Sequence, residues 1–234
     1  MATMLPRRQS LPTASRLDRA YRATSLGLAA AAVAAALAAG TAMLATPTPA
    51  TAFPQPSFAP VAWELDFENR TPARIEVGGE AYWYLPYTVT NNTDEARLFL
   101  PDVEMVTREG DVLRAGDNIP LSVFNAIKGR VRSLPLIPPQ EVAGRILVGR
   151  DQAKSSVAIW REPTTEMGTF DIYVGGLSGE VVRLTDREGN ELTDADGVPI
   201  LVRKTKRLTY RVRGDDIADG RDSIARVREE WVMR

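Results

Sequence analysis

The chain has 234 residues, with 29 Lys and Arg against 30 Asp and Glu, and it contains neither Cys nor His. The absence of Cys excludes disulfides, thiol nucleophiles and Cys-based zinc sites. The absence of His excludes the commonest general base and the commonest transition-metal ligand. Catalysis on this chain would therefore depend on carboxylates, Lys, Tyr, Ser, Thr or a hard cation.

The first 52 residues have the pattern of an export segment. A basic stretch with five Arg and one Asp precedes an Ala-rich apolar run at residues 26–45, and Ala50-Thr51-Ala52 follows. This order predicts a secretory signal peptide at residues 1–52. The alternative is an uncleaved membrane anchor, because the apolar run has about the ~20 residues that a spanning helix needs. Arg7-Arg8 leaves twin-arginine export open beside general export.

Either alternative places the rest of the chain outside the cytoplasm, in the periplasm or the extracellular space. Cleavage after Ala52 would remove the five Arg and the one Asp, which leaves 24 basic and 29 acidic residues and a net charge of −5. An acidic balance argues against nucleic acid as a partner. Residues 53–60 contain three prolines and predict an extended spacer. We therefore expect one domain at residues 61–234.

The most regular pattern in this domain is Ala81 to Asn92. Alternation predicts a strand with Trp83, Leu85, Tyr87 and Val89 on one face and Tyr82, Tyr84, Thr88 and Thr90 on the other. Pro86 cannot donate to a ladder, so we expect a bulge or a sheet edge there.

Short strands recur along the remainder of the chain. Alternating apolar residues, bounded by Gly, Pro, Asn or Asp, predict strands at residues 63–67, 75–77, 97–100, 103–107, 112–113, 142–148, 157–160, 169–174, 181–184, 199–213 and 224–233. A polar hairpin loop is expected at 185–197, a further loop at 215–222, and an irregular connection at 134–139.

One helix is predicted at residues 118–132. Pro120 suits a first helical position, with Asn118 or Ile119 as the cap, and apolar residues recur at helical spacing from Leu121. Many short strands with one short helix predict an all-β fold, an immunoglobulin-like antiparallel β-sandwich preceded by an N-terminal hydrophobic export helix.

Four short segments carry a resemblance to a known group. They are YWYLPYTVTNNT at residues 82–93, AIKGR at 126–130, GLSGE at 176–180 and WVMR at 231–234. With these segments the chain is similar to a functionally uncharacterised family of exported bacterial proteins with an immunoglobulin-like domain. The resemblance implies the fold and the location, and it carries over no catalytic residue.

Two polar constellations offer possible binding sites. Oxygen ligands in the loop at residues 186–196 suit Ca²⁺, or they serve only the hairpin turn; they are Asp186, Asn190, Asp194 and Asp196. The basic cluster suits a polyanion, or it is a solvated strand face paired to acids at a sheet edge; it consists of Arg203, Lys204, Lys206, Arg207, Arg211 and Arg213. We favour the second interpretation of each.

Aromatic residues and acidic residues offer two more candidate sites. Tyr82 and Tyr84, with Trp160, suit sugar stacking if exposed, but we expect them in the core, covered by Leu121, Phe124 and Ile127. The acidic pairs Glu64 with Asp66 and Glu229 with Glu230 would be needed for a hydrolase, although alternation places Glu64 and Asp66 on a solvent face.

We therefore predict no catalytic residue, no metal ligand and no cofactor. The expected function is a non-enzymatic module that binds or supports an envelope protein or polysaccharide, with the membrane involved only through the N-terminal segment. The alternatives are a carbohydrate- or polyanion-binding module and a carboxylate-dependent hydrolase.

Overall fold

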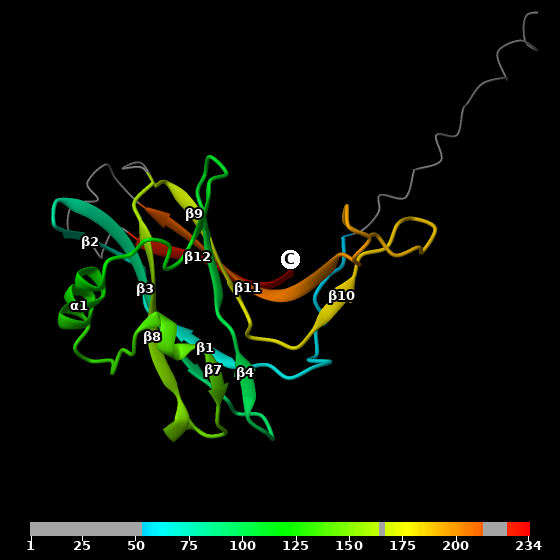
Figure 1. Ribbon diagram of the computed structural model, residues 1–234, viewed down its shortest axis with the longest axis horizontal. Coiled ribbons are helices and arrows are strands. Elements are labelled where there is room, and N and C mark those ends of the chain that lie inside the picture. Colours follow the sequence, from blue (N-terminus) through cyan, green and yellow to red (C-terminus); the bar gives the residue numbers. More distant parts are fainter. Residues whose placement is uncertain (1–52, 164–166, 213–223) are drawn as a thin grey trace, which may run out of the picture. The chain divides into compact units, whose positions relative to one another are not determined.

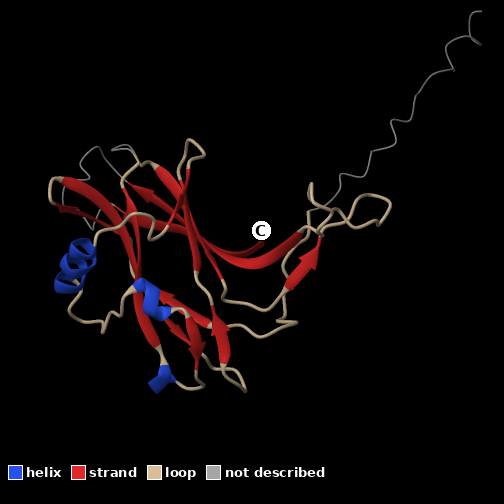
Figure 2. Ribbon diagram, viewed as in Figure 1, coloured by secondary structure: helices blue, strands red, loops and turns tan. Residues whose placement is uncertain are grey.

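Antiparallel strands dominate the computed structural model, which describes residues 53–163, 167–212 and 224–234 (Figures 1 and 2). The predicted export helix, residue Arg213 and the predicted loop at 215–222 lie outside the described residues. The strands form two main sheets and a separate two-stranded pair, with few helices. The prediction of an all-β sandwich is confirmed at this level.

The first sheet is built around β3, which runs from Glu80 to Thr90. Along one edge β3 pairs without interruption with β8 (Lys154–Arg161). Along its other edge lie β1 (Asp66–Asn69) and then β2 (Ala73–Val77), which pair with opposite ends of β3. The stretch with the strongest alternation in the sequence is therefore the central strand of its sheet.

The predicted bulge or edge at Pro86 is wrong. Pro86 pairs in register with Val157 of β8, and it is buried in the middle of the sheet. The strand pairing is interrupted instead on the other edge of β3, in the segment between β1 and β2. There the amide of Arg70 donates to the Pro86 carbonyl over 3.0 Å. The missing amide hydrogen is tolerated because the neighbouring strand is broken at that position.

The second sheet is built around β11 (Leu201–Val212). It pairs with β12 (Ile224–Met233), β9 (Thr169–Gly175) and β10 (Val181–Arg183). Beyond β9 the sheet continues with β5 (Asp102–Val106) and β6 (Val112–Arg114). The strand predicted at residues 224–233 is confirmed. Next to the sheets, β4 (Arg97–Phe99) pairs with β7 (Gly144–Ile146).

The main core lies between the two sheets. One face of β3 presents Trp83, Leu85, Tyr87 and Val89 to this core, where Trp83 meets Phe170 of β9 edge to face with ring centroids 5.5 Å apart. The alternation in the sequence thus predicted the core face of β3 correctly, because successive side chains of a strand point to opposite faces.

The helix α1 (Leu121–Arg130) covers the outer face of the first sheet. Its buried residues Val123, Phe124 and Ile127 contact Tyr82 and Tyr84 from β3. The predicted cap is wrong: Pro120 itself is the N-cap residue and no side chain caps the helix.

Two short helical segments were not predicted as helices. They are α2 (Pro139–Val142) and a single 3₁₀ turn (Arg150–Gln152). A proline pair at 138–139 starts α2, because proline suits a first helical turn. Among the described helices none is both long and apolar enough to cross a membrane.

Candidate functional site

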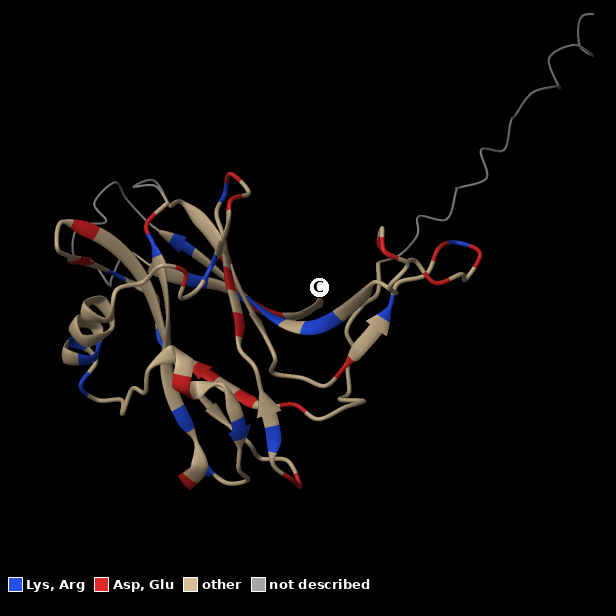
Figure 3. Cartoon of the chain, in the orientation of Figure 1, with Lys and Arg blue, Asp and Glu red and all other residues tan. Residues whose placement is uncertain are grey.

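Figure 3 shows basic residues along β11, and three members of the basic cluster, Lys204, Lys206 and Arg207, form ion pairs with acids of the same domain. Lys204 is only 2% exposed, and its Nζ lies 2.7 Å from Glu64 Oε1 and 3.1 Å from Glu180 Oε2. The same Nζ donates to the carbonyl of Ser57 over 3.0 Å. Lys204 is therefore a buried structural cation and offers no surface for a polyanion.

This buried cluster keeps its charges. Burial disfavours the charged form of Lys204, but its hydrogen bonds to Glu64 and Glu180 outweigh burial and raise the pKa of the ammonium group. Burial also opposes ionisation of Glu180, but hydrogen bonds from the Ser57 amide and from Lys204 lower the pKa of that carboxyl. Both groups are held ionised by each other.

The neighbouring cations are paired as well. Lys206 Nζ lies 3.3 Å from Glu229 and 4.1 Å from the centre of the Trp231 ring, and Arg207 lies 2.7 Å from Asp171. Pairing to acids is thus confirmed for these residues. The predicted position of these residues at a sheet edge is wrong, because β11 lies between β9 and β12.

The aromatic candidates lie in the core, as predicted. Tyr82 and Tyr84 are each 1% exposed beneath α1, and Trp160 is buried on the opposite face of the sheet. Leu121, one of the three predicted covering residues, is exposed, whereas Phe124 and Ile127 are buried. Sugar stacking on Tyr82 and Tyr84 is therefore excluded by their burial.

The carboxylate pairs predicted from sequence do not form clefts. The prediction that Glu64 lies on a solvent face is wrong, because its carboxylate contacts the buried ammonium group of Lys204. Asp66 is exposed and accepts from the Asn92 amide. Glu229 binds Lys206 and Arg226, whereas Glu230 binds Arg207 and Arg228.

The oxygen ligands of the loop at residues 186–196 serve the turns. Asp186 Oδ1 accepts from the amides of Glu188 and Asn190, and Asp194 Oδ1 accepts from the amides of Asp196 and Val198. Hydrogen bonds from Asn190 lower the pKa of Asp186. Within the described ranges no group of three or more acidic residues could hold a metal ion.

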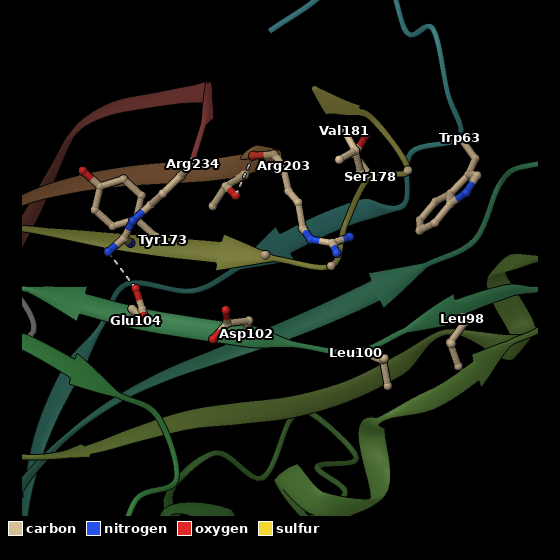
Figure 4. Close-up of a pocket in the computed structure, with 14 residues that line it drawn as sticks. Trp63, Leu98, Leu100, Asp102, Glu104, Tyr173, Ser178, Val181, Arg203 and Arg234 are labelled. Atoms are coloured by element: carbon tan, nitrogen blue, oxygen red, sulfur yellow. Dashed lines mark hydrogen bonds and ion pairs between the residues drawn. The ribbon is translucent and has the colours of Figure 1, made fainter. Parts of the chain in front are cut away.

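A groove of about 670 Å³ lies where β9 ends, on the outer face of the second sheet. Residues from five strands and their connections line it (Figure 4). They are Trp63, Leu98, Leu100, Asp102, Glu104, Tyr173, Gly175, Gly176, Ser178, Gly179, Val181, Arg203, Thr205 and Arg234. We call this feature the β9–β10 groove.

Glycines make the floor of the β9–β10 groove. Gly176 has a φ of +82°, and a Cβ there would lie 2.3 Å from the carbonyl oxygen of Leu100. A Cβ on Gly179 would lie 2.5 Å from Nε1 of Trp63. Only glycine fits these two positions, because the backbone turns and closely approaches its neighbours there.

The charges in the groove fall into two kinds. Glu104 is held between Arg234 at 2.7 Å and Arg114 at 3.3 Å, and the Arg234 guanidinium lies 4.2 Å from the centre of the Tyr173 ring. In contrast, Arg203 and Asp102 form no ion pair within the part of the chain that the structure describes. The groove thus presents one available cation and one available anion.

One end of the groove is apolar. Leu98 and Leu100 are 54% and 59% exposed, and Val181 is 40% exposed. Trp63 lies beside them and packs on Gly179, with the Arg97 guanidinium 5.7 Å from the centre of its ring. Exposed apolar side chains at the rim of a concavity are typical of a binding site.

The acidic residues of the groove differ in what they contact. Asp102 and Glu104 are the two carboxylates that line the groove. Glycoside hydrolysis needs one of its two carboxylic acids to donate a proton. In this groove Glu104 is already bound by Arg234 and Arg114, which leaves Asp102 as the one carboxylate of the described groove without an ion pair.

Sequence reasoning missed this groove. Its residues come from segments that are far apart in the chain, and each segment alone reads as an ordinary strand or turn. The one usable indication was the glycine-rich segment at residues 175–179, which was interpreted only as a turn and as part of a resemblance.

No protein-family model matches the chain, and searches of curated proteins and of solved structures gave no significant match. The function is therefore argued from the geometry of the site.

Proposed function

We propose that this chain is an exported, non-catalytic binding module of the cell envelope, with an immunoglobulin-like β-sandwich as its scaffold. The observation that carries the proposal is the β9–β10 groove, where Arg203 and Asp102 have no ion-pair partner among the described residues and exposed Leu98 and Leu100 line the same groove. Convergent polar groups in an otherwise apolar concavity are typical of ligand sites.

The export part of the proposal depends on the first 52 residues. Their basic stretch, apolar run and A-x-A sequence favour delivery to the periplasm or the extracellular space, with or without retention at the membrane by residues 26–45. The resemblance to exported bacterial proteins supports the same location and the immunoglobulin-like scaffold.

The alternatives are less well supported. A polyanion site would need several available cations, whereas Lys204, Lys206 and Arg207 are bound by acids. A hydrolase of this kind would need two carboxyl groups that can both act on the substrate, whereas Glu104 is already bound by Arg234 and Arg114.

Affinity capture from intact envelope tests the proposal. The tagged full chain is compared with Arg203→Glu and with Arg211→Glu, which changes an exposed residue of the same strand outside the groove. We expect the native chain and Arg211→Glu to retain the same component and Arg203→Glu to lose it. Identical capture by all three proteins would contradict a role of the groove.

A further inference from the structure

The β9–β10 groove has the size of a site for a small ligand or a short segment of a larger one. Its volume of about 670 Å³ falls within the roughly 300–1,000 Å³ that such sites occupy. Gly175, Gly176 and Gly179 line it with backbone atoms alone, because Asp102, Leu100 and Trp63 of the same chain occupy the space where their side chains would stand.

The available charges lie on opposite sides of this floor. Asp102 of β5 is opposite Gly175 at the end of β9, and Arg203 reaches over from β11 on the other side (Figure 4). Since Glu104 and Arg234 satisfy each other, the groove is complementary to a ligand with one anionic and one cationic or donor group. The planar guanidinium of Arg203 favours a carboxylate.

The apolar end adds a third requirement. Leu98, Leu100 and Val181 expose enough apolar surface to receive an aliphatic or aromatic side chain of the ligand. A short peptide combines these three features, because it carries a carboxylate, amide or ammonium donors and an apolar side chain in one small molecule.

A sugar fits these features less well. Sugar rings stack on open aromatic faces, but Arg234 lies over Tyr173, and Trp63 packs on Gly179 with Arg97 near its ring. We infer that the β9–β10 groove binds a short peptide whose carboxylate pairs with Arg203, whose nitrogen donors face Asp102, and whose apolar side chain lies against Leu98 and Leu100. This inference depends on the proposed binding function.

A defined probe tests the inference. Pools of synthetic random tetrapeptides with Leu fixed at one position are passed over the immobilised full chain, once with free carboxyl termini and once as carboxyl-terminal amides. We expect peptides from the free-acid pool to bind at least ten times more tightly than their amides. Arg203→Gln should abolish that preference, and Arg211→Gln on the same strand should retain it.

Binding measurements on two further variants test the class of ligand. Asp102→Asn should weaken binding of the selected peptides several-fold, and Leu98→Ser should remove the preference for Leu in the pool. Equal binding of acids and amides to the native chain would overturn the inference. Binding of neutral oligosaccharides without any peptide would also overturn the inference, but it would leave the proposed binding function intact. Envelope capture that is unchanged by Arg203→Glu would contradict the proposed binding function itself.

Discussion

Lys204 Nζ lies 2.7 Å from Glu64 Oε1, and this contact joins the segment before the first strand to β11. Glu64 precedes the first strand, whereas Lys204 lies near the start of β11. Glu180 completes the cluster and accepts from the amide of Ser57 over 2.9 Å. The segment that leads from the predicted export region into the sandwich is therefore anchored by a buried ionic cluster.

Lys204→Met should lower the free energy of unfolding by about 3–5 kcal/mol, because removal of one partner leaves the others as buried, uncompensated charges. Chemical denaturation in urea measures the change. The triple variant Glu64→Gln, Lys204→Met and Glu180→Gln serves as the control and should recover most of the loss, since no charge remains in the cluster. A single Lys204→Met variant as stable as the native chain would contradict this role.

The same cluster predicts that the free energy of unfolding decreases at acidic pH, which is the acid limb of the stability curve. The pKa of Glu180 is lowered in the folded state, so its contribution is present above the unfolded value of about 4.5 and is lost as the pH falls through the lower folded value. Glu180→Gln should therefore lose less stability between about pH 7 and pH 3.5 than the native chain does.

An exposed carboxylate is the matched control for this measurement. Glu109→Gln, in the turn after β5, measures how far the loss of one exposed carboxylate by itself changes the slope of unfolding free energy against pH. If Glu180→Gln and Glu109→Gln gave the same slope, the acid limb would have another origin.

A second ionic contact lies at the end of β8, within the first sheet. Glu162 Oε1 accepts from Arg74 Nε over 2.8 Å and from Trp83 Nε1 over 2.9 Å, and its Oε2 accepts from Arg74 Nη2 over 2.9 Å. Glu162→Ala should cost about 3 kcal/mol, because a bidentate guanidinium and a core indole lose their acceptor together. The exposed pair Arg183 and Glu191 provides the control, since Glu191→Ala should cause no measurable change in the urea midpoint.

The sequence was most informative where structure depends on neighbours along one strand. Alternation assigned both faces of β3 correctly, including the burial of Tyr82 and Tyr84. The charge pattern was misleading for Lys204, because a run of basic residues suggests a solvated strand face unless the distant partners Glu64 and Glu180 are known. The groove could not be predicted for the same reason. Asp102 and Arg203 are about a hundred positions apart, and only the pairing of β5 and β11 with β9 brings them to one site.

Gly176 supplies a test of how the groove is built. Its φ of +82° strains any other residue, and the Cβ of an alanine would lie 2.3 Å from the Leu100 carbonyl oxygen. Gly189 has a similar φ of +89° with nothing within 4 Å of the corresponding Cβ. Gly189→Ala should therefore lose only about 1–2 kcal/mol of unfolding free energy. Gly176→Ala should lose about 1–3 kcal/mol more, because the backbone at Leu100 has to move.

Urea denaturation of the two alanine variants gives the difference directly, and envelope capture gives its functional consequence. Displacement of Leu100 moves the apolar wall of the β9–β10 groove away from its glycine floor, so Gly176→Ala should weaken capture while Gly189→Ala leaves it unchanged. Equal losses of stability in both variants would mean that backbone conformation alone demands glycine at position 176. The approach of Leu100 would then have no part in shaping the groove.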